Sequence, residues 1–447
     1  MKIEIPEKAK IILNTIHNAG FEAYVVGGCV RDSILGRIPG DWDITTSAKP
    51  QDIKKLFKRT IDTGIEHGTV TVMMGKDGYE VTTYRIDGEY SDNRHPKEVT
   101  FTASLRQDME RRDFTINAMA YNDEEGLIDN FGGIEDIEKK VIRCVGNPRE
   151  RFGEDALRIM RAIRFSAQLG YDIDENTKIA IKELAPTLEK ISAERIQVEL
   201  VKMLTSKYPE KLLDAYKMGI TKVILPEFDI CMATPQNTKH HCYNVGEHIV
   251  KSIQNVEADR LLRLTMLFHD IGKPKAHTID EKGNSHFIGH EKISADMAKT
   301  IMRRLKFDRD TMDRVCNLVK YHDIRFKITP AKVRMSIYKV GEKDYPLMFK
   351  VKRADTLAQS NYMRNEKLEW IDDLEKQYEK IVEEGDCLSL KTLSVKGNDL
   401  VSLGIKPGKQ IGDTLMNMLR DVLNEPSHNT KEYLLEPVNL KRFMSGE

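Results

Sequence analysis

The sequence predicts an α+β protein in which a small mixed sheet near the N-terminus is followed by a mostly helical remainder. Strand-like segments, some apolar and some alternating, are concentrated between residues 23 and 84. Apolar positions with a helical period dominate from residue 151 onwards. The chain has 447 residues, which is too long for one compact core, so about two to four domains are expected.

The first segments of the chain predict a phosphate-binding turn. Residues 5–19 have the apolar period of a helix, and residues 23–26 form an apolar run typical of a buried strand. The run ends at Gly27-Gly28, where the missing Cβ lets the backbone approach a phosphate closely. The VRDSIL segment that follows predicts a short helix, whose first amides would face the anion, and its Arg31 adds a charged donor.

Two aspartates predict a metal site beside that turn. Asp41 and Asp43 flank Trp42 and lead into the strand-like segment at residues 44–46. Side chains at i and i+2 of a strand point to the same face, so the two carboxylates lie side by side. Such a pair repels itself unless a cation lies between them, and Mg²⁺ held by carboxylates plus substrate phosphates is a common arrangement. The glycine turn alone is most often an ordinary turn, but the two features together predict phosphoryl transfer.

A β-hairpin is expected next. Residues 69–74 and 79–84 alternate apolar and polar side chains on either side of a short turn. Glu80, on the second strand, could approach the aspartate pair as a third carboxylate, or it could be a surface glutamate of an edge strand. Residues 51–58 predict a short helix, and the polar, turn-rich residues 86–99 predict a mobile loop.

The segment RRDFTINAMAY supplies further candidates. Arg111 and Arg112 precede an apolar stretch and are either a solvated helix start or groups that neutralise phosphates. Asp113 or Asn117 could reach a ribose hydroxyl. The Gly-Gly pair within residues 129–137 predicts a turn that leads into another helix.

Residues 151–171 predict one amphipathic helix that stops at a glycine. A row of charged side chains follows this helix at three-residue steps: Asp155, Arg158, Arg161 and Arg164. An ordinary helix with a basic outer face would show the same row.

The first two members of the row have a sharper interpretation. A carboxylate accepts hydrogen bonds and a guanidinium only donates them. Cytosine and adenine each present an amine donor beside an unprotonated ring nitrogen, whereas guanine and uracil present a ring N–H and a carbonyl. Asp155 and Arg158 therefore match C and A, and each mismatched buried polar group would cost about 1–3 kcal/mol. The pair predicts base selection without a nucleic-acid template.

Composition limits the class of protein. The 70 basic and 70 acidic residues cancel, so an RNA partner must be met by a local basic face. The N-terminal sequence lacks the apolar region of a signal peptide, and no apolar run approaches the roughly 20 residues that span a bilayer. The six cysteines are scattered and show no CxxC, which suits reduced thiols. We therefore expect a cytoplasmic protein without membrane contact.

Four segments carry a family resemblance: GGCVRDSILGR with DWD, RRDFTINAMAY, EDALRIMRAIRF, and ISAERIQVEL at residues 191–200. Together they resemble the class II tRNA nucleotidyltransferases, the CCA-adding enzymes, and their bacterial poly(A) polymerase relatives. The resemblance implies a polymerase-β-like head with the catalytic sheet, then all-helical neck, body and tail domains along which tRNA lies. The implied ranges are 1–140 for the nucleotidyltransferase head, 141–210 for the neck with its nucleotide-selecting helix, 211–365 for the body, and 366–447 for the tRNA-binding tail.

The resemblance also implies roles and partners. Asp41 and Asp43 would hold two Mg²⁺ ions, and Gly28, Arg31 and Arg112 would contact the triphosphate and sugar of ATP or CTP. Asp155 and Arg158 would read the base, with Arg161 and Arg164 supporting the nucleotide. In two-metal phosphoryl transfer, one ion lowers the pKa of the tRNA 3′-hydroxyl that attacks the α-phosphate, and the other stabilises the pyrophosphate that leaves.

The loop after the hairpin bears on the product. Asp87, Tyr90 and Arg94 match the family's flexible loop region, and a full-length loop favours complete CCA addition, or A addition, over CC addition. His95 stands where the family often has a second arginine. A-only addition and poly(A) synthesis both stay open.

A second constellation lies in the helical remainder. The apolar helical run at residues 261–268 ends in an adjacent His-Asp pair. The candidates are His248, His269, Asp270, His290, His322 and Asp355. Imidazole nitrogens and carboxylate oxygens suit Mn, Fe, Ni, Zn or Mg. A lone buried histidine is usually structural, but several such residues among apolar helices predict a metal site.

This stretch resembles the HD phosphohydrolases. His248, His269, Asp270 and Asp355 match the H…HD…D pattern, and His290 and His322 resemble the extra histidines of dinuclear members. The implied activity is hydrolysis of a phosphate mono- or diester, for example at damaged or cyclised RNA ends. His240 and His241 are rival first ligands, but position against the motif favours His248.

Other readings stay open at this point. The body could be an inherited helical domain with an inactive metal site, or the HD domain could be the main enzyme beside an RNA-binding head. The last eighty residues predict helices with a turn near residues 404–408. The chain could be a monomer or a homodimer.

Overall fold

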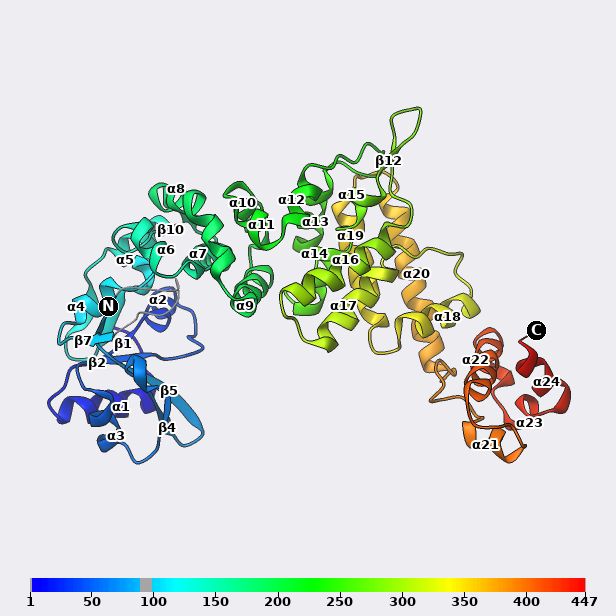
Figure 1. Cartoon of the computed structure of the whole chain (residues 1–447), viewed down its shortest axis with the longest axis horizontal. Coiled ribbons are helices and arrows are strands. Elements are labelled where there is room, and N and C mark those ends of the chain that lie inside the picture. The colour runs from blue at the N-terminus through cyan, green and yellow to red at the C-terminus, as the bar shows by residue number, and fades with distance from the viewer. Residues whose placement is uncertain (1, 89–98, 447) are drawn as a thin grey trace. The chain divides into compact units, whose positions relative to one another are not determined.

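A computed structural model describes residues 2–88 and 99–446 of the chain. It divides into two compact units, Met1–Pro226 and Glu227–Glu447, which run from blue to green and from green to red in Figure 1. The predicted domain boundaries after residues 140, 210 and 365 are finer than this division and stay predictions.

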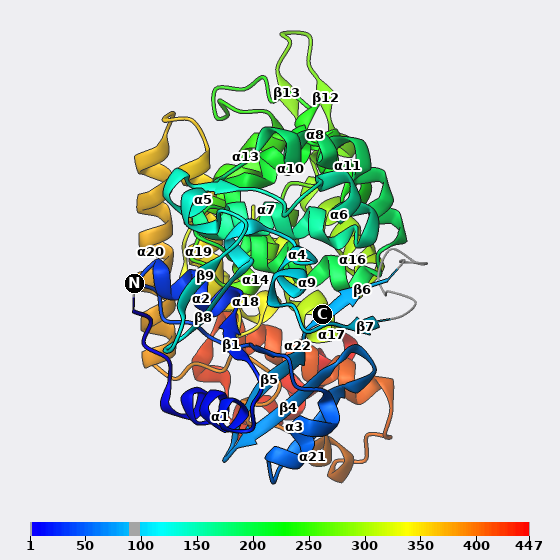
Figure 2. The same cartoon turned by 90° about the vertical axis from the view of Figure 1, so that its left-hand side faces the viewer.

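The first unit is built on a seven-stranded sheet with the strand order β3-β4-β5-β2-β1-β8-β9. Its strands are β1 (Ala23–Val26), β2 (Ile44–Thr46), β3 (Thr60–Gly64), β4 (Thr69–Met74), β5 (Asp77–Thr83), β8 (Met119–Asn122) and β9 (Gly126–Asp129). β2 and β5 are parallel, and the other neighbours are antiparallel. β1, β2 and β8 are buried along their whole length, which places the core at the centre of the sheet. The predicted mixed sheet is confirmed, and Figure 2 shows its long β4–β5 hairpin beside α3.

The first unit also contains helices and short strands. The helices are α1 (Glu7–Asn18), α2 (Gly28–Ile34), α3 (Pro50–Leu56), α4 (Leu105–Glu110), α5 (Gly133–Lys139), α6 (Pro148–Glu154), α7 (Leu157–Leu169), α8 (Glu175–Leu184), α9 (Ala193–Leu204), α10 (Leu212–Lys217) and α11 (Ile220–Ile224). The short strands are β6 (Arg85–Asp87), β7 (Val99–Phe101), β10 (Val141–Ile142) and β11 (Asp172–Ile173). Of the predicted loop residues, Tyr90, Arg94 and His95 lie outside the described residues.

Local patterns located most of these elements. The helix expected over residues 5–19 is α1, and the expected hairpin is β4–β5, with its turn at Gly75-Lys76. β8 was not predicted as a strand, because the segment was interpreted only as an apolar stretch after two arginines. It pairs with β1 and is central to the sheet.

The prediction of a single helix over residues 151–171 is wrong, because the helix is interrupted at Asp155. This residue is extended (φ −138°, ψ 104°) between α6 and α7, and its carboxylate accepts a hydrogen bond from the Leu157 amide at 3.0 Å. Aspartate side chains compete for nearby backbone amides in this way and favour helix starts over helix interiors. The predicted stop is confirmed, since Gly170 ends α7 with φ 75°.

The second unit is helical. Its helices are α12 (Pro226–Met232), α13 (Val245–Gln254), α14 (Arg260–Phe268), α15 (Lys273–Ala276), α16 (His290–Arg304), α17 (Arg309–Tyr321), α18 (Pro330–Val340), α19 (Tyr345–Ala358), α20 (Arg364–Glu383), α21 (Gly397–Ser402), α22 (Lys409–Asn424), α23 (Lys431–Leu434) and α24 (Pro437–Ser445), with one small hairpin of β12 (Thr278–Ile279) and β13 (Ser285–His286). From Leu261 to Phe268 every residue of α14 is buried, against α13, α16, α17 and α19. This confirms the predicted apolar helix and makes it the centre of the unit.

Two further predictions concern the whole chain. Among residues 2–88 and 99–446, no helix combines the length and the apolar character that crossing a membrane requires. All six cysteines are free thiols, as their scatter predicted.

Candidate functional site

The residues predicted for the head meet in one cavity of about 560 Å³, with Glu80 as the exception. The predicted residues that line it are Gly27, Gly28, Arg31, Asp41, Asp43, Arg112, Asp155, Arg158, Arg161 and Arg164. They come from the β1–α2 turn and α2, the segment before β2, the turn after α4, the break between α6 and α7, and α7 itself. The lining holds eight basic and five acidic side chains, a balance that suits a polyanion such as a triphosphate.

The glycine turn is shaped by close packing. Gly27 has φ 83°, which only glycine adopts without strain, and its amide donates to the Met119 carbonyl at 3.2 Å. A Cβ at this position would lie 3.4 Å from Nη1 of Arg112. The backbone and the Arg112 guanidinium therefore share one wall of the cavity.

The two aspartates lie at the start of β2. Asp41 and Asp43 precede the strand instead of belonging to it, but the Val26 amide donates to the Asp43 carbonyl at 3.0 Å, so the extended pairing continues to Asp43. Partial burial raises the pKa of Asp43, the Arg112 guanidinium opposes this, and the Asp41 carboxylate adds to it. The pair thus has the mutual repulsion expected of two ligands to one cation.

Glu80 lies next to this pair although it does not line the cavity. Ile44 on β2 pairs with Val81 on the parallel strand β5. Glu80, the residue before Val81, is therefore at the level of Asp43, the residue before Ile44. Partial burial raises the pKa of Glu80, and Asp43 and Asp41 raise it further. Three carboxylates that repel one another, all with hard oxygen donors, fit Mg²⁺.

The predicted base-reading pair is held by several partners, of which Glu154 and Arg195 were not predicted from the sequence. Asp155 receives Nη2 of Arg195 on Oδ2 at 2.7 Å and Nη1 on Oδ1 at 3.3 Å. Nη1 of Arg158 donates to Glu154 at 2.6 Å, and Nη2 donates to the Arg111 carbonyl at 2.9 Å. Glu154 stands four residues before Arg158, a spacing that could have revealed it, whereas Arg195 lies forty residues from Asp155.

Three other arginines of the cavity surround one aromatic ring. The guanidinium carbons of Arg31, Arg161 and Arg164 lie 5.1, 5.4 and 4.0 Å from the centre of the Phe165 ring. Each also has a polar partner: Asn117 at 2.6 Å for Arg31, Asp113 at 2.6 Å for Arg161, and Glu199 for Arg164. These contacts fix the guanidinium groups before a nucleotide arrives, and Asp113 holds Arg161 in addition to lining the cavity.

The second unit holds a buried group of imidazoles and carboxylates, which we call the His/Asp cluster: His248, His269, Asp270, His290, His322 and Asp355. Nε2 of His248 lies 3.2 Å from Nε2 of His269, 3.2 Å from Asp270 Oδ2 and 3.0 Å from Asp355 Oδ1. Nε2 of His290 lies 3.2 Å from Asp270 Oδ1 and 3.4 Å from Nε2 of His322. Two candidate metal groups therefore share Asp270.

The imidazoles of the cluster are oriented as metal ligands are. Each Nδ1 donates to a backbone carbonyl: His248 to Ala358 at 3.3 Å, His269 to Met266 at 2.7 Å, His290 to Phe287 at 2.8 Å and His322 to Val319 at 2.7 Å. Such bonds fix the tautomer and leave the Nε2 lone pairs free. All four Nε2 atoms lie within 3.7 Å of an Asp270 oxygen, and those of His248 and His269 also lie 3.0 and 3.9 Å from Asp355 Oδ1. The donor set therefore fits one or two divalent ions.

The charges within the His/Asp cluster also favour a bound cation. Burial lowers the pKa of His248, but the hydrogen bonds and charges of Asp270 and Asp355 outweigh it and raise that pKa to about 9. Burial raises the pKa of Asp270, yet His269 and Lys273 keep it well below its usual range. The two carboxylates favour positive charge between them, whether a proton or a metal ion.

The rival first ligands lie outside the cluster. His240 accepts a hydrogen bond from Nζ of Lys367 at Nδ1, 3.1 Å away. The ring of His241 meets the ring of His248 edge-on, with centroids 5.2 Å apart, and does not join either metal group of the described residues. Of the three histidines, His248 is the one whose nitrogen faces the aspartates.

Comparisons with known proteins give the family. Residues 23–143 match the family "Poly A polymerase head domain", residues 170–232 match "Probable RNA and SrmB- binding site of polymerase A", and residues 280–438 match "tRNA nucleotidyltransferase domain 2 putative". Residues 233–279, which hold His248 and the His269-Asp270 pair, lie between these matches.

The relatives that match over nearly the whole chain include several CCA-adding enzymes. A CCA-adding enzyme of Levilactobacillus brevis is 36% identical over 97% of this chain and 97% of its own, and one of Enterococcus faecalis is 35% identical over 96% and 94%. Among solved structures, the Bacillus stearothermophilus CCA-adding enzyme in complex with CTP is 27% identical with a TM-score of 0.71, covering 98% of this chain and 97% of that one. The Thermotoga maritima CCA-adding enzyme complexed with tRNA shares the fold over the whole of both chains, at 21% identity and a TM-score of 0.58. By this full-length identity, the chain belongs to the family of CCA-adding enzymes and is a nucleotidyltransferase.

Proposed function

We propose that this chain adds C, C and A to the 3′ end of tRNA from CTP and ATP and releases pyrophosphate. The observation that carries this proposal is that one cavity combines the acidic pair Asp41/Asp43 with the base-reading pair Asp155/Arg158. The first pair suits phosphoryl transfer from any nucleotide, and the second restricts the nucleotide to C and A. Full-length relatives named CCA-adding enzymes support the same assignment.

Asp41 and Asp43, with Glu80 close by, would hold Mg²⁺. When bound, Mg²⁺ supplies Lewis-acid chemistry that favours the ionised tRNA 3′-hydroxyl and the departing pyrophosphate. The Gly27 backbone and the guanidinium groups of Arg112 and Arg31 orient the triphosphate. The hydroxyl oxygen then forms a bond to the α-phosphorus in line with the bond to pyrophosphate, which breaks.

The protein selects the base through groups that are already fixed. A carboxylate offers about four lone-pair sites, and Asp155 uses three of them for Arg195 and the Leu157 amide. The remaining site can accept the exocyclic amine of C or A. Arg158, held by Glu154, donates to the ring nitrogen, so G and U would leave buried polar groups unpaired.

Three acceptors test this function. Full-length protein is incubated with tRNA lacking CCA, tRNA ending in C and tRNA ending in CC, each with labelled CTP or ATP. Ordered addition of two C and one A supports the proposal. Use of ATP on the CC-ended tRNA alone would indicate A-only addition, and long A tails would indicate a poly(A) polymerase.

We propose a second activity for the His/Asp cluster, a metal-dependent phosphohydrolase acting on a phosphate mono- or diester. The convergence of four Nε2 atoms on Asp270, with Asp355 beside two of them, supports it. When bound, Mn²⁺, Ni²⁺, Fe²⁺, Zn²⁺ or Mg²⁺ would activate the attacking water. Release of phosphate from glycerol 2-phosphate with each metal, lost in His269→Ala, would establish the activity, whereas equal release by both proteins would refute it.

Two properties stay predictions. A cytoplasmic location rests on sequence composition alone. The chain is expected to be a monomer or a homodimer, which sedimentation of the purified protein would decide.

A further inference from the structure

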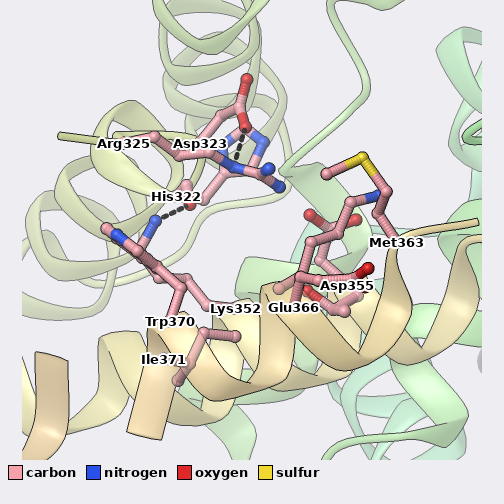
Figure 3. Close-up of a pocket in the computed structure, with 11 residues that line it drawn as sticks. His322, Asp323, Arg325, Lys352, Asp355, Met363, Glu366, Trp370 and Ile371 are labelled. Carbon is pink, nitrogen blue, oxygen red and sulfur yellow. Dashed lines mark hydrogen bonds and ion pairs between the residues drawn. The ribbon is translucent and has the colours of Figure 1, made fainter. Parts of the chain in front are cut away.

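A cavity of about 200 Å³ opens beside the His/Asp cluster in the second unit (Figure 3). His322 and Asp355 line it and are also members of the cluster. The remaining wall comes largely from α19 and the first turns of α20. A ligand in this cavity would therefore reach the edge of the cluster.

The side of the cavity formed by α20 carries an indole. Trp370 is half-buried, and its Nε1 donates to the Phe326 carbonyl at 3.1 Å, which fixes the plane of the ring. Ile371 and Met363 line the same cavity. Figure 3 shows Trp370 and Lys352 at one side of the cavity, with Asp355, Met363 and Glu366 at the other. A fixed indole with aliphatic neighbours is a surface on which a planar ring can bind.

Lys352 connects the Trp370 side of the cavity to His322 of the His/Asp cluster. Its Nζ donates to the His322 carbonyl and to the Ile324 carbonyl, both at 2.7 Å, and lies 5.5 Å from the centre of the Trp370 ring. The lysine is thus already bound to the protein and is not a free anion receptor. The buried side chain of Lys352 thus contacts both the backbone of His322 and the indole of Trp370.

Charge indicates which part of a phosphate ester this cavity takes. Its lining holds three cationic side chains and three acidic ones, Arg325, Lys352 and Lys367 against Asp323, Asp355 and Glu366. A lining without net charge does not attract a phosphate by itself. It suits the neutral part of the ester, and carboxylates such as Glu366 can accept hydrogen bonds from sugar hydroxyls.

We propose that this cavity holds the nucleoside of a ribonucleoside phosphate, with its base against Trp370 and its phosphate at the His/Asp cluster. The proposal rests on the phosphohydrolase activity proposed above. In the reaction, the oxygen of water forms a bond to phosphorus and the bond from phosphorus to the sugar oxygen breaks. A proton from water passes to that oxygen, leaving a nucleoside hydroxyl and phosphate.

Binding is tested without turnover. Adenosine is added to the full chain with Mn²⁺, and tryptophan emission is followed. The chain has two tryptophans, so Trp370→Phe and Trp42→Phe separate their signals. Quenching that saturates in Trp42→Phe and is absent in Trp370→Phe is expected. Quenching that survives unchanged in Trp370→Phe would overturn the proposal.

Turnover is tested with a matched pair of substrates, 3′-AMP and glycerol 2-phosphate, which lacks a base. Trp370→Leu should raise the KM for 3′-AMP about 10-fold, the scale of a lost base–aromatic contact, and leave the KM for glycerol 2-phosphate within about twofold. Trp370→Phe should keep most of the affinity for 3′-AMP. Equal effects of Trp370→Leu on both substrates would overturn the base-binding role.

Two further arms complete the design. An RNA oligonucleotide with a 3′-terminal phosphate distinguishes the terminal nucleotide of an RNA from a free mononucleotide, because only an accepted RNA end should show the same Trp370→Leu effect. If neither substrate is hydrolysed with any metal, the phosphohydrolase proposal fails, and the adenosine titration then decides separately whether the cavity binds a nucleoside.

Discussion

The guanidinium of Arg195 on α9 donates two hydrogen bonds to the carboxylate of Asp155, Nη2 to Oδ2 at 2.7 Å and Nη1 to Oδ1 at 3.3 Å. Asp155 sits in an extended break between two helices, where its own backbone would leave the side chain several rotamers. A bidentate arginine removes that freedom. The orientation of the proposed base acceptor is thus set by a residue forty positions away.

Arg195→Met should therefore loosen base selection. Loss of a charge-assisted pair of about 1.5–3 kcal/mol corresponds to a fall of roughly 10- to 100-fold in kcat/KM for CTP. Incorporation of UTP relative to CTP should rise, since Asp155 can then turn away from the amine position. Single-nucleotide extension of tRNA lacking CCA measures both quantities.

A matched control is available on the surface of the same unit. Arg149 holds Glu183 with two similar bonds at 2.7 and 2.8 Å, and both side chains are about half exposed. Arg149→Met should leave CTP selection unchanged. If Arg195→Met kept the wild-type ratio of UTP to CTP, the positioning role of Arg195 would be disproved.

Asp43→Asn and His269→Ala should separate the two proposed activities. Asp43→Asn removes a charged ligand beside Asp41, and nucleotide addition should fall on the order of 1,000-fold because metal stabilisation of the transition state amounts to several kcal/mol. Its hydrolysis of glycerol 2-phosphate should be unchanged. His269→Ala should show the reverse pattern, and full nucleotide addition by Asp43→Asn would mean that the aspartates hold no catalytic metal.

Local patterns predicted the parts of this structure that local physics decides. Alternation located β4 and β5, and glycine at a left-handed position located the end of α7. Fold class followed from the same local patterns. The aspartates and arginines of the head cavity stand in short sequence segments, whereas the members of the His/Asp cluster lie in five separate segments and were predicted from their resemblance to the HD pattern.

What the sequence concealed depends on tertiary contacts. The break at Asp155 leaves the apolar period of the flanking helices intact, so periodicity could not reveal it. Arg195 has no spacing relation to Asp155, and β8 became a central strand only by pairing with β1. For the first histidine ligand, the motif favoured His248 over His240 and His241, and the fold brings Nε2 of His248 to 3.2 Å from Asp270 and 3.0 Å from Asp355.

Asp108 is expected to make the free energy of unfolding depend on pH. It is fully buried and receives Arg111 at 2.7 Å, Arg112 at 3.3 Å and Thr45 at 3.0 Å. Burial raises the pKa of Asp108, but the two arginines outweigh it and hold that pKa below its usual value. The ion pair therefore contributes its full stability above the unfolded pKa of about 3.9, and the contribution is lost as pH falls through the lower folded pKa.

Asp108→Asn should cost about 3 kcal/mol at pH 7, because it leaves two arginines partly buried without their partner. The difference between wild type and variant should shrink steadily below about pH 4. Urea denaturation of the full chain at several pH values measures it. Asp62→Asn, which breaks an exposed pair with Lys54, should cost less than about 1 kcal/mol at every pH, and a pH-independent cost for Asp108→Asn would contradict the assignment.

The His/Asp cluster should bind a divalent metal ion, and loss of one of its histidines should weaken that binding. Wild-type protein, purified without chelator and analysed by mass spectrometry of its metal content, should carry one or two equivalents of a divalent transition metal, because two ligand groups share Asp270. His269→Ala removes an Nε2 that faces His248 and Asp270 and should lower that content several-fold.

Treatment of the wild type with a chelator should lower its melting temperature, because metal binding to the folded state is lost. His286→Ala, whose imidazole is exposed and paired with Asp280, should keep both the metal content and the shift. A His269→Ala protein with undiminished metal would show that the cluster is a structural polar core, with its carboxylates balanced by Lys273 and a protonated His248.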